Sequence, residues 1–224
     1  TEKFKSNASA SVHIPRSMTV DVKVVLLGKH DVGKSSLVER FLHDRWKDQS
    51  ATVGAAFGAK AINIDNRTVT CGIWDTAGAE RYESMTKLYY REASAAIICY
   101  DMTDESSFAK ARFWVEEIQQ HREDAIIYII GTKADLVGTR GCTFHSEVLQ
   151  YAANINSQTF STSALTGQGV QALFESIATE FLEIQRANFE MSVAQPSDPA
   201  VQLSRHSEYR RSGPRSEISL PCCN

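Results

Sequence analysis

Apolar and polar positions along the chain alternate between two patterns, one typical of strands and one typical of helices. Strand-like runs, most of them continuously apolar, lie at 22–27, 57–64, 68–74, 95–100, 125–130 and 159–162. Helical spacing of apolar residues begins at residue 34 and recurs at 107–121, 146–155 and 170–186. Strands that are apolar on both faces need cover on both sides, so we expect an α/β domain with a six-stranded, mainly parallel sheet and helices on both faces.

Both ends of the chain differ in composition from the segment between them. Residues 1–19 contain Ser, Ala and Lys, without an apolar stretch long enough for a signal peptide. Beyond Glu190 the composition changes to Ser, Pro, Arg and Gln. Such segments bury too little apolar surface to become ordered. We therefore expect a disordered extension at 1–19, a folded domain at 20–187 and a disordered tail at 188–224.

Composition and charge exclude several classes of protein. The chain has 24 basic and 27 acidic side chains, a formal net charge of -3, and so lacks the positive field that draws proteins to nucleic acid. Its apolar runs are too short to span a membrane, so any membrane attachment should be peripheral. Cys71 and Cys99 fall in predicted strands, while Cys222 and Cys223 are adjacent. This is no disulfide framework, and it suits a reducing compartment such as the cytosol.

Residues 28–35 follow the first predicted strand and lead into the first predicted helix. They read Gly-Lys-His-Asp-Val-Gly-Lys-Ser, which matches the phosphate-binding pattern G-x-x-x-x-G-K-S. Glycines in such a loop let backbone N–H groups surround a polyphosphate, and the helix N-terminus adds positive potential. We expect Lys34 to reach the β and γ phosphates and Ser35 to ligate magnesium. The alternative is a fortuitous turn, which the flanking strand and helix disfavour.

A second candidate for metal binding follows the predicted strand at 68–74. Asp75 precedes Thr-Ala-Gly, and a carboxylate at a strand tip can hold the same magnesium ion through water. Gly78 permits its backbone N–H to meet a γ phosphate. Taken alone, this tetrapeptide is more often a simple turn. Its position after the phosphate loop favours the functional interpretation.

Two further motifs follow the last two predicted strands. Residues 131–135 read Gly-Thr-Lys-Ala-Asp, and residues 161–164 read Ser-Thr-Ser-Ala. In this order the motifs resemble those of the Ras superfamily of small GTPases, which have a P-loop NTPase fold, and within it the Rab family of membrane-traffic regulators. The resemblance covers residues 20–185. It implies a switch that binds GTP or GDP together with Mg²⁺.

The resemblance also implies how the base is held. Asp135 should accept two hydrogen bonds from guanine, Lys133 should line the base with its alkyl stem, and Ser163 and Ala164 should close the pocket. A carboxylate only accepts hydrogen bonds, so it pairs with the donor edge of guanine, which adenine lacks. Thr52 fits the first-switch threonine that ligates magnesium. The expected GTP contacts are Gly28, Asp31, Val32, Gly33, Lys34, Ser35, Ser36, Thr52, Gly78, Thr132, Lys133, Asp135, Ser163 and Ala164, and the expected Mg²⁺ ligands are Ser35, Thr52 and Asp75.

Aromatic residues indicate the Rab family in particular. The Glu-Arg-Tyr at 80–82 and the Tyr-Tyr-Arg at 89–91 look like parts of the Rab second switch. Phe57, Trp74 and Tyr89 match the aromatic triad that Rabs present to effectors, although core packing is an alternative for such residues.

Short stretches at 54–57, 72–74 and 131–133 look closest to the Rab twenty-four type, the branch associated with autophagy. This finer resemblance implies an autophagosomal or perinuclear membrane.

The chain departs from the Rab pattern at several positions. Ala79 stands where most Rabs carry the Gln that orients the attacking water, and a methyl group cannot do so. With Lys34 as the remaining catalytic group, we expect slow intrinsic hydrolysis. Thr132 replaces an Asn whose amide ties the base loop to the phosphate loop, so guanine affinity should fall by about 1 to 3 kcal/mol. His30 is either an exposed loop imidazole or a group near the γ phosphate, and whether Trp46 reaches the guanine is left open.

The chain ends Pro-Cys-Cys-Asn, which resembles the paired cysteines that Rabs geranylgeranylate. Basic and acidic residues balance in the tail, so no polybasic patch assists membrane binding. One lipid chain holds a protein only marginally, and two give residence. We expect lipid on Cys222 and Cys223, and a location in the cytosol and on the cytoplasmic face of intracellular membranes. Without the domain before them, the two adjacent thiols would be explained as well by chance or by metal scavenging as by lipidation.

These features favour a regulatory switch over two alternatives. A Rab-like switch would use effectors, an exchange factor, a GAP, an escort protein and a GDP dissociation inhibitor. One alternative is a GTP-locked scaffold that never cycles. The other is a P-loop hydrolase whose turnover is its function, against which Ala79 and the guanine-selective Asp135 both argue.

Overall fold

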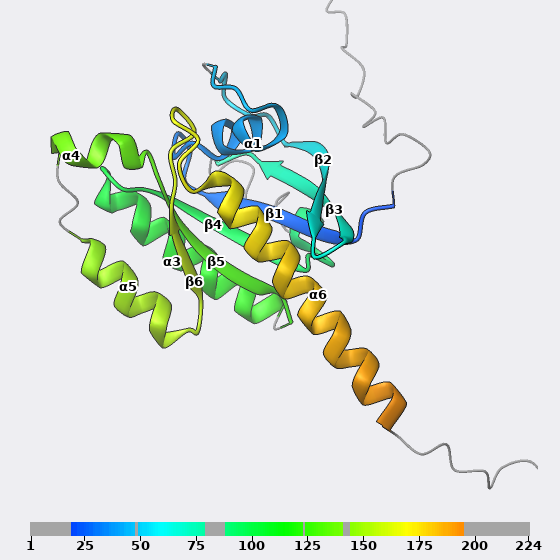
Figure 1. The fold of residues 1–224 in the computed structure, drawn as a ribbon. Helices are drawn as coiled ribbons and strands as arrows, with labels where there is room; N and C mark the ends of the chain where they lie inside the picture. Colours follow the sequence, from blue (N-terminus) through cyan, green and yellow to red (C-terminus); the bar gives the residue numbers. More distant parts are fainter. Residues whose placement is uncertain (1–18, 48, 79–87, 123, 141–143, 195–224) are drawn as a thin grey trace, which may run out of the picture. The chain divides into compact units, whose positions relative to one another are not determined.

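A six-stranded sheet forms the centre of the domain, with strand order β2-β3-β1-β4-β5-β6. The structure is a computed structural model and describes residues 19–47, 49–78, 88–122, 124–140 and 144–194 (Figure 1). β2 pairs antiparallel with β3, and the other pairs are parallel. The strands are β1 (Val22–Gly28), β2 (Ala55–Ile64), β3 (Arg67–Thr76), β4 (Ala95–Asp101), β5 (Ile126–Thr132) and β6 (Gln158–Ser161). The predicted six-stranded, mainly parallel sheet is therefore confirmed.

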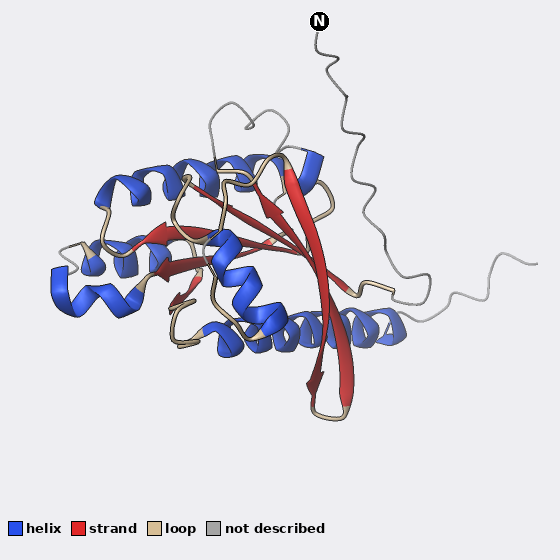
Figure 2. Cartoon of the chain, turned by 90° about the horizontal axis from the view of Figure 1, so that it is seen from above, coloured by secondary structure: helices blue, strands red, loops and turns tan. Residues whose placement is uncertain are grey.

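Helices lie on both faces of this sheet (Figure 2). They are α1 (Lys34–His43), α3 (Glu105–His121), the 3-10 helix η2 (Ala134–Leu136), α4 (Val137–Arg140), α5 (His145–Asn154) and α6 (Val170–Ala194). The short η2 and α4 were not predicted. α6 also runs past the expected end at residue 186, because residues 187–194 include the strong helix formers Ala, Glu and Met and the next proline is Pro196. The segment at 188–194 is therefore helical, where a disordered tail was expected.

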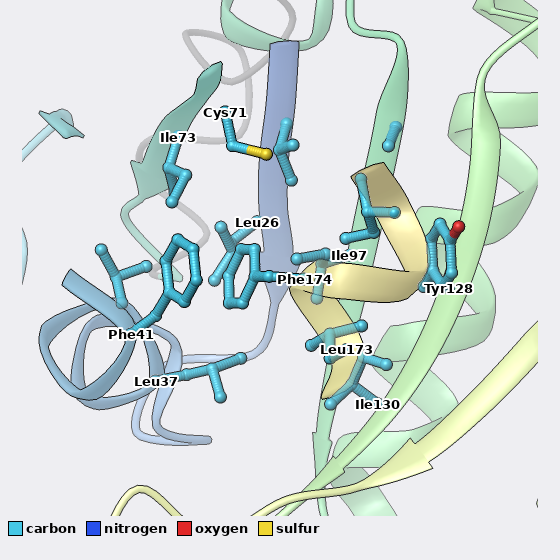
Figure 3. Packing of buried hydrophobic residues seen from close by; sticks show 14 of the residues in the cluster. Leu26, Leu37, Phe41, Cys71, Ile73, Ile97, Tyr128, Ile130, Leu173 and Phe174 are labelled. Atoms are coloured by element: carbon cyan, nitrogen blue, oxygen red, sulfur yellow. The ribbon is translucent and has the colours of Figure 1, made fainter. Parts of the chain in front are cut away.

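Alternation along β1 sends successive side chains into two separate cores. Val24 and Leu26 join the core beneath α1 and α6, whereas Val25 and Leu27 join the core beneath α3 and α5. In the first core, Phe41 of α1 stacks on Phe174 of α6 with ring centroids 3.7 Å apart (Figure 3). Burial on both faces explains the continuously apolar strands in the sequence.

The chain divides into two units, residues 1–186 and 187–224. The first unit contains the whole sheet. Most of the expected N-terminal extension and of the tail lies outside the described residues, so the limits of the predicted segments stay predictions. Among the helices that the structure describes, none has both the length and the apolar character needed to cross a membrane.

The sheet brings the predicted motifs together at one edge. β1, β3, β5 and β6 run in the same direction, so the segments that follow them leave the sheet at the carboxyl ends of the strands. In open α/β sheets this edge is where ligands bind. The phosphate loop, Asp75 and its neighbours, and both candidate base motifs lie there.

Candidate functional site

The phosphate loop ends in a glycine that the backbone geometry requires. Gly33 caps the N-terminus of α1 with φ 95°, a backbone conformation that residues with a side chain rarely adopt. The Leu37 N–H donates to the Gly33 carbonyl at 2.9 Å, so the amides of residues 34–36 precede the first bond of the helix. These amides, and the absence of acidic residues from the first turn, leave a positive end suited to an anion.

The buried side chain of Lys34 reaches from the start of α1 back to the first residues of the phosphate loop. It is 5% exposed, and its Nζ donates to the carbonyls of Gly28 at 3.1 Å and Lys29 at 2.9 Å. Burial lowers the pKa of Lys34, while nearby acidic groups, Asp75 among them, act in the opposite direction. A buried ammonium held mainly by neutral carbonyls has an unmet preference for an anion. A phosphate oxygen would meet that preference.

Three oxygen-bearing side chains gather beside the loop. The Ser35 and Thr52 hydroxyls lie 2.8 Å apart, and Asp75 is 4% exposed at the tip of β3. Asp75 Oδ1 is buried without a hydrogen-bond partner among the described residues. Burial raises the pKa of Asp75, and Ser35 and Lys34 act to lower it. A buried carboxylate oxygen with no donor is costly unless a cation is present.

These residues fit magnesium. Mg²⁺ prefers hard oxygen ligands and is often bound by one or two carboxylates together with substrate phosphates and waters. Ser35, Thr52 and Asp75 supply such oxygens. Within the described part of the chain, no cluster of three or more His, Cys, Asp or Glu side chains is arranged to hold a metal by itself. Two hydroxyls and one carboxylate are few ligands for Mg²⁺, so polyphosphate oxygens and waters would complete the coordination.

Gly78 lies against the phosphate loop so closely that no other residue fits without a shift. A Cβ atom at this position would come within 2.5 Å of Lys34 Nζ and of the His30 backbone nitrogen. Just before it, the Ala77 N–H donates to the Gly54 carbonyl at 2.8 Å, which ties this segment to the one after Thr52. Ala79, the next residue, lies outside the described residues.

The predicted base motifs meet at the other end of the site. Ser163 Oγ donates to Asp135 Oδ1 at 2.6 Å, which joins the segment after β6 to the segment after β5. Lys133 has φ 58° and its Nζ forms an ion pair with Asp101 Oδ2 at 2.7 Å. Burial acts to raise the pKa of Asp101, but hydrogen bonds from Lys133 and Thr103 leave that pKa below its usual value. Asp101 thus holds the Lys133 ammonium group, and Lys133 lines the cavity.

Thr132 does not break the tie between the base motif and the phosphate loop, as the sequence had led us to expect. Its Oγ1 lies 2.5 Å from the Val32 carbonyl and 2.8 Å from the Tyr100 carbonyl. The single hydroxyl proton is shared between two acceptors, and one of them belongs to the phosphate loop. The predicted loss of this link was wrong, because the Thr132 hydroxyl, at a position that is 4% exposed, itself reaches a carbonyl of the phosphate loop. The expected fall in guanine affinity stays a prediction.

A cavity of about 470 Å³ connects the phosphate and base ends of the site. Of the expected GTP contacts, it is lined by Asp31, Gly33, Lys34, Ser35, Ser36, Thr52, Gly78, Thr132, Lys133, Asp135 and Ala164. The other described contacts lie just behind this lining: Gly28 and Val32 provide carbonyls to Lys34 and Thr132, and Ser163 bonds to Asp135. His30 and Trp46 also line the cavity, and Trp46 is 47% exposed. The structure thus brings Trp46 to the site, a position that the sequence left open.

The three aromatics expected on the effector surface are half-buried. Phe57 and Trp74 are paired across β2 and β3 with ring centroids 4.7 Å apart, and Lys23 Nζ lies 4.8 Å from the centroid of the Trp74 ring. Trp74 and Tyr89 pack against the second core. Their outer surfaces remain exposed, so core packing does not account for them completely.

Other residues at the site were not predicted from the sequence. Leu136 and Leu165 add apolar lining to the base end, and Asp101 positions Lys133. Arg40 of α1 donates to the backbone of the segment after β6. Their contacts join segments far apart in the chain, so the spacing of residue types along the sequence does not predict them.

Comparison with known proteins agrees with this geometry. The family model described as Ras family matches residues 23–183. Ras-related protein Rab-24 of Dictyostelium discoideum is 43% identical over 164 residues, 72% of this chain and 81% of the relative. GTP-binding protein ypt5 of Schizosaccharomyces pombe is 44% identical over 173 residues, 75% and 82% of the two chains, and Ras-related protein Rab-21 of Geodia cydonium is 41% identical over 170 residues, 75% and 74%. The chain therefore belongs to the Rab family of small GTPases, within the Ras superfamily.

Proposed function

We propose that this protein is a guanine-nucleotide switch in intracellular membrane traffic, with a role in autophagy. It binds GTP or GDP with Mg²⁺ and recruits effectors in the GTP state. The observation that carries the proposal is the short Ser35–Thr52 contact beside the unpartnered carboxylate oxygen of Asp75. It joins the phosphate loop to a separate loop through a group of Mg²⁺-type ligands, which is the connection that a γ-phosphate-dependent switch needs.

Each part of the site has a role in holding the nucleotide. Lys34 and the amides at the start of α1 bind the phosphates, and Asp135 selects guanine through its donor edge. Trp46 and the Lys133 stem cover the faces of the base. Ser35, Thr52 and Asp75 would hold Mg²⁺, which neutralises phosphate charge when bound.

Two contacts support a conformational response to the γ phosphate. Thr52 precedes Gly54, whose carbonyl accepts from the Ala77 N–H, and Gly78 approaches Lys34 within van der Waals reach. A γ phosphate bound by both Lys34 and the Gly78 N–H would order the two segments together, and its loss would release them. Phe57, Trp74 and Tyr89 lie beside these segments and form the effector surface in this proposal.

Hydrolysis is the slow part of the proposed cycle. Ala79 has no group that can orient water, so positioning by Lys34 and neighbouring amides supplies what catalysis remains. A GAP would then control the lifetime of the GTP state, and an exchange factor would reload the site. A protein that is mostly GTP-bound in cells is the second candidate function, and Ala79 favours it.

Membrane attachment is proposed through the paired cysteines. Cys222 and Cys223, which lie outside the described residues, would carry geranylgeranyl groups added with the help of an escort protein. A GDP dissociation inhibitor would shield them in the cytosol. Two lipid chains give the residence that one lacks. The expected location is the cytoplasmic face of autophagosomal or perinuclear membranes.

Competition binding with a fluorescent guanine nucleotide tests the proposal. GTP and GDP should displace the probe and ATP should not, and removal of Mg²⁺ with EDTA should speed probe release. Thr52→Ala should weaken GTP more than GDP, because the threonine contributes in the GTP state. Equal displacement by ATP and GTP, or an EDTA-independent release rate, would contradict it.

A further inference from the structure

In the segment after β6, residues 162–165, one arginine from outside the segment holds the carbonyls of Ala164 and Leu165. Arg40 Nε donates to the Ala164 carbonyl at 2.7 Å, and Arg40 NH2 donates to the Leu165 carbonyl at 2.9 Å. These two donors lie on one edge of the planar guanidinium, so a single side chain clamps two consecutive peptide units. Among the described residues, Arg40 is the only side chain that donates to either carbonyl.

Arg40 belongs to the same helix that begins the phosphate site. α1 carries Lys34 and Ser35 in its first turn and Arg40 in its last. A cation in the last turn of a helix is stabilised by the helix dipole. The Arg40 side chain is only 15% exposed, and NH1 also donates to the Asp44 carbonyl and carboxylate. The contact with Asp44 at the end of α1 therefore fixes the Arg40 side chain independently of the segment after β6.

Within that segment, Thr162 and Ser163 are buried and bonded to the segment after β5, whereas Ala164 and Leu165 are less firmly held. Leu165 is 51% exposed, so packing does not immobilise it. Internal bonds, such as Ser163 N–H to the Gln168 carbonyl at 3.0 Å, close residues 163–168 on themselves without attaching residues 164 and 165 to the rest of the domain. The Ala164 N–H donates to no protein acceptor among the described residues, and Ala164 lines the cavity.

We propose that Arg40 is a positioning residue for base recognition, which holds the Ala164 peptide so that its N–H faces the bound base. The inference rests on the proposed guanine-nucleotide function and adds a determinant of base specificity to it. Arg40 touches no nucleotide. It acts by linking the base end of the site to the helix that holds the phosphates.

The experiment compares the dissociation constants of GDP and ADP for the intact chain, each with Mg²⁺, by competition against a fluorescent guanine nucleotide. Arg40→Gln should weaken GDP by about tenfold or more, since two charge-assisted hydrogen bonds are lost. The affinity for ADP, which is held by its phosphates, should not change. The GDP-to-ADP selectivity therefore falls. Arg40→Lys, a point charge that reaches one carbonyl at a time, should lie between parent and Arg40→Gln.

Asp44→Asn is the matched control. It removes the ion pair with Arg40 while leaving both backbone bonds, and Asn tolerates the left-handed φ of 49° at this helix end. Selectivity should stay within about twofold of the parent, because the Asp44 side chain is exposed. Thermal unfolding of each variant with GDP and Mg²⁺ checks folding.

The outcomes separate the inference from the function on which it rests. A parent protein that does not prefer GDP over ADP sinks the proposed function. A parent that prefers GDP, with unchanged selectivity in Arg40→Gln, overturns the role of Arg40 alone. Equal weakening of both nucleotides would show a general structural role and also overturn it. If Arg40→Gln does not unfold cooperatively, Arg40→Lys decides, and parental selectivity in that variant overturns the inference.

Discussion

Thr132→Val removes the hydroxyl that joins the base motif to the phosphate loop while keeping the shape of the side chain. Thr132 Oγ1 lies 2.5 Å from the Val32 carbonyl and 2.8 Å from the Tyr100 carbonyl, at a position that is 4% exposed. Valine fills the same volume, so no cavity is created, but the two buried carbonyls lose the hydroxyl as a donor. The substitution therefore isolates the polar contact from packing.

The size of the effect follows from the side-chain hydrogen bond that is lost. One hydroxyl proton serves two acceptors, so the loss corresponds to one buried hydrogen bond, or about 1 to 3 kcal/mol. For a domain of this size, each kcal/mol lowers the unfolding midpoint by about 2 to 4 °C, so a fall of about 2 to 12 °C is expected. Thr132→Ser keeps the hydroxyl and should lose less.

Thermal unfolding with saturating GDP and Mg²⁺ measures this difference, and GDP affinity is measured separately because bound ligand also raises the midpoint. We expect Thr132→Val to unfold at a lower temperature than both the parent and Thr132→Ser. We also expect it to bind GDP more weakly, since the base motif is released from the phosphate loop. A midpoint and an affinity equal to those of the parent would refute the argument that Thr132 replaces the link expected from Asn.

Further substitutions test other parts of the account. Ser35→Asn should weaken Mg²⁺ and bias the site toward GDP, which calorimetry of GTP binding would detect; an unchanged GTP affinity would contradict the metal role. Ala79→Gln should raise the single-turnover hydrolysis rate by restoring an amide that orients water, whereas equal rates would show that Ala79 does not limit hydrolysis. Gly78→Ala should lower GTP affinity more than GDP affinity, because the added Cβ comes within 2.5 Å of Lys34 Nζ; parallel changes would argue against a γ-phosphate contact. Changing Cys222 and Cys223 together to Ser should abolish recovery in the membrane fraction and leave an unmodified C-terminal peptide by mass spectrometry, and unchanged recovery would exclude lipidation as the attachment.

The sequence predicted the parts of the structure that depend on neighbours in the chain. The glycine-rich loop could be placed because it lies between an apolar strand and an amphipathic helix, and each of these has a clear period. Strand positions were correct to within two residues at their ends. The two-sided burial of β1 follows from its continuous apolar run.

Contacts between distant segments could not be predicted in this way. The bond from Thr132 to Val32 joins positions 100 residues apart, and the bond from Arg40 to Ala164 joins positions 124 residues apart. Neither residue type indicates its partner, since a buried threonine or a helical arginine can form hydrogen bonds with many different groups. The expected defect at Thr132 came from considering its side chain without the carbonyls that surround it. The end of α6 is hard to place for a different reason, because the composition changes near Glu190 while the helix continues to Ala194.

The most direct test of the guanine-nucleotide switch is to identify what the protein carries. The full chain is purified from cells in the presence of Mg²⁺ and denatured, and the released nucleotide is separated by chromatography and measured against the protein concentration. We predict close to one guanine nucleotide per chain, with GTP a substantial fraction because Ala79 slows hydrolysis. Adenine nucleotide in its place, or a protein that folds stably without nucleotide, would contradict it.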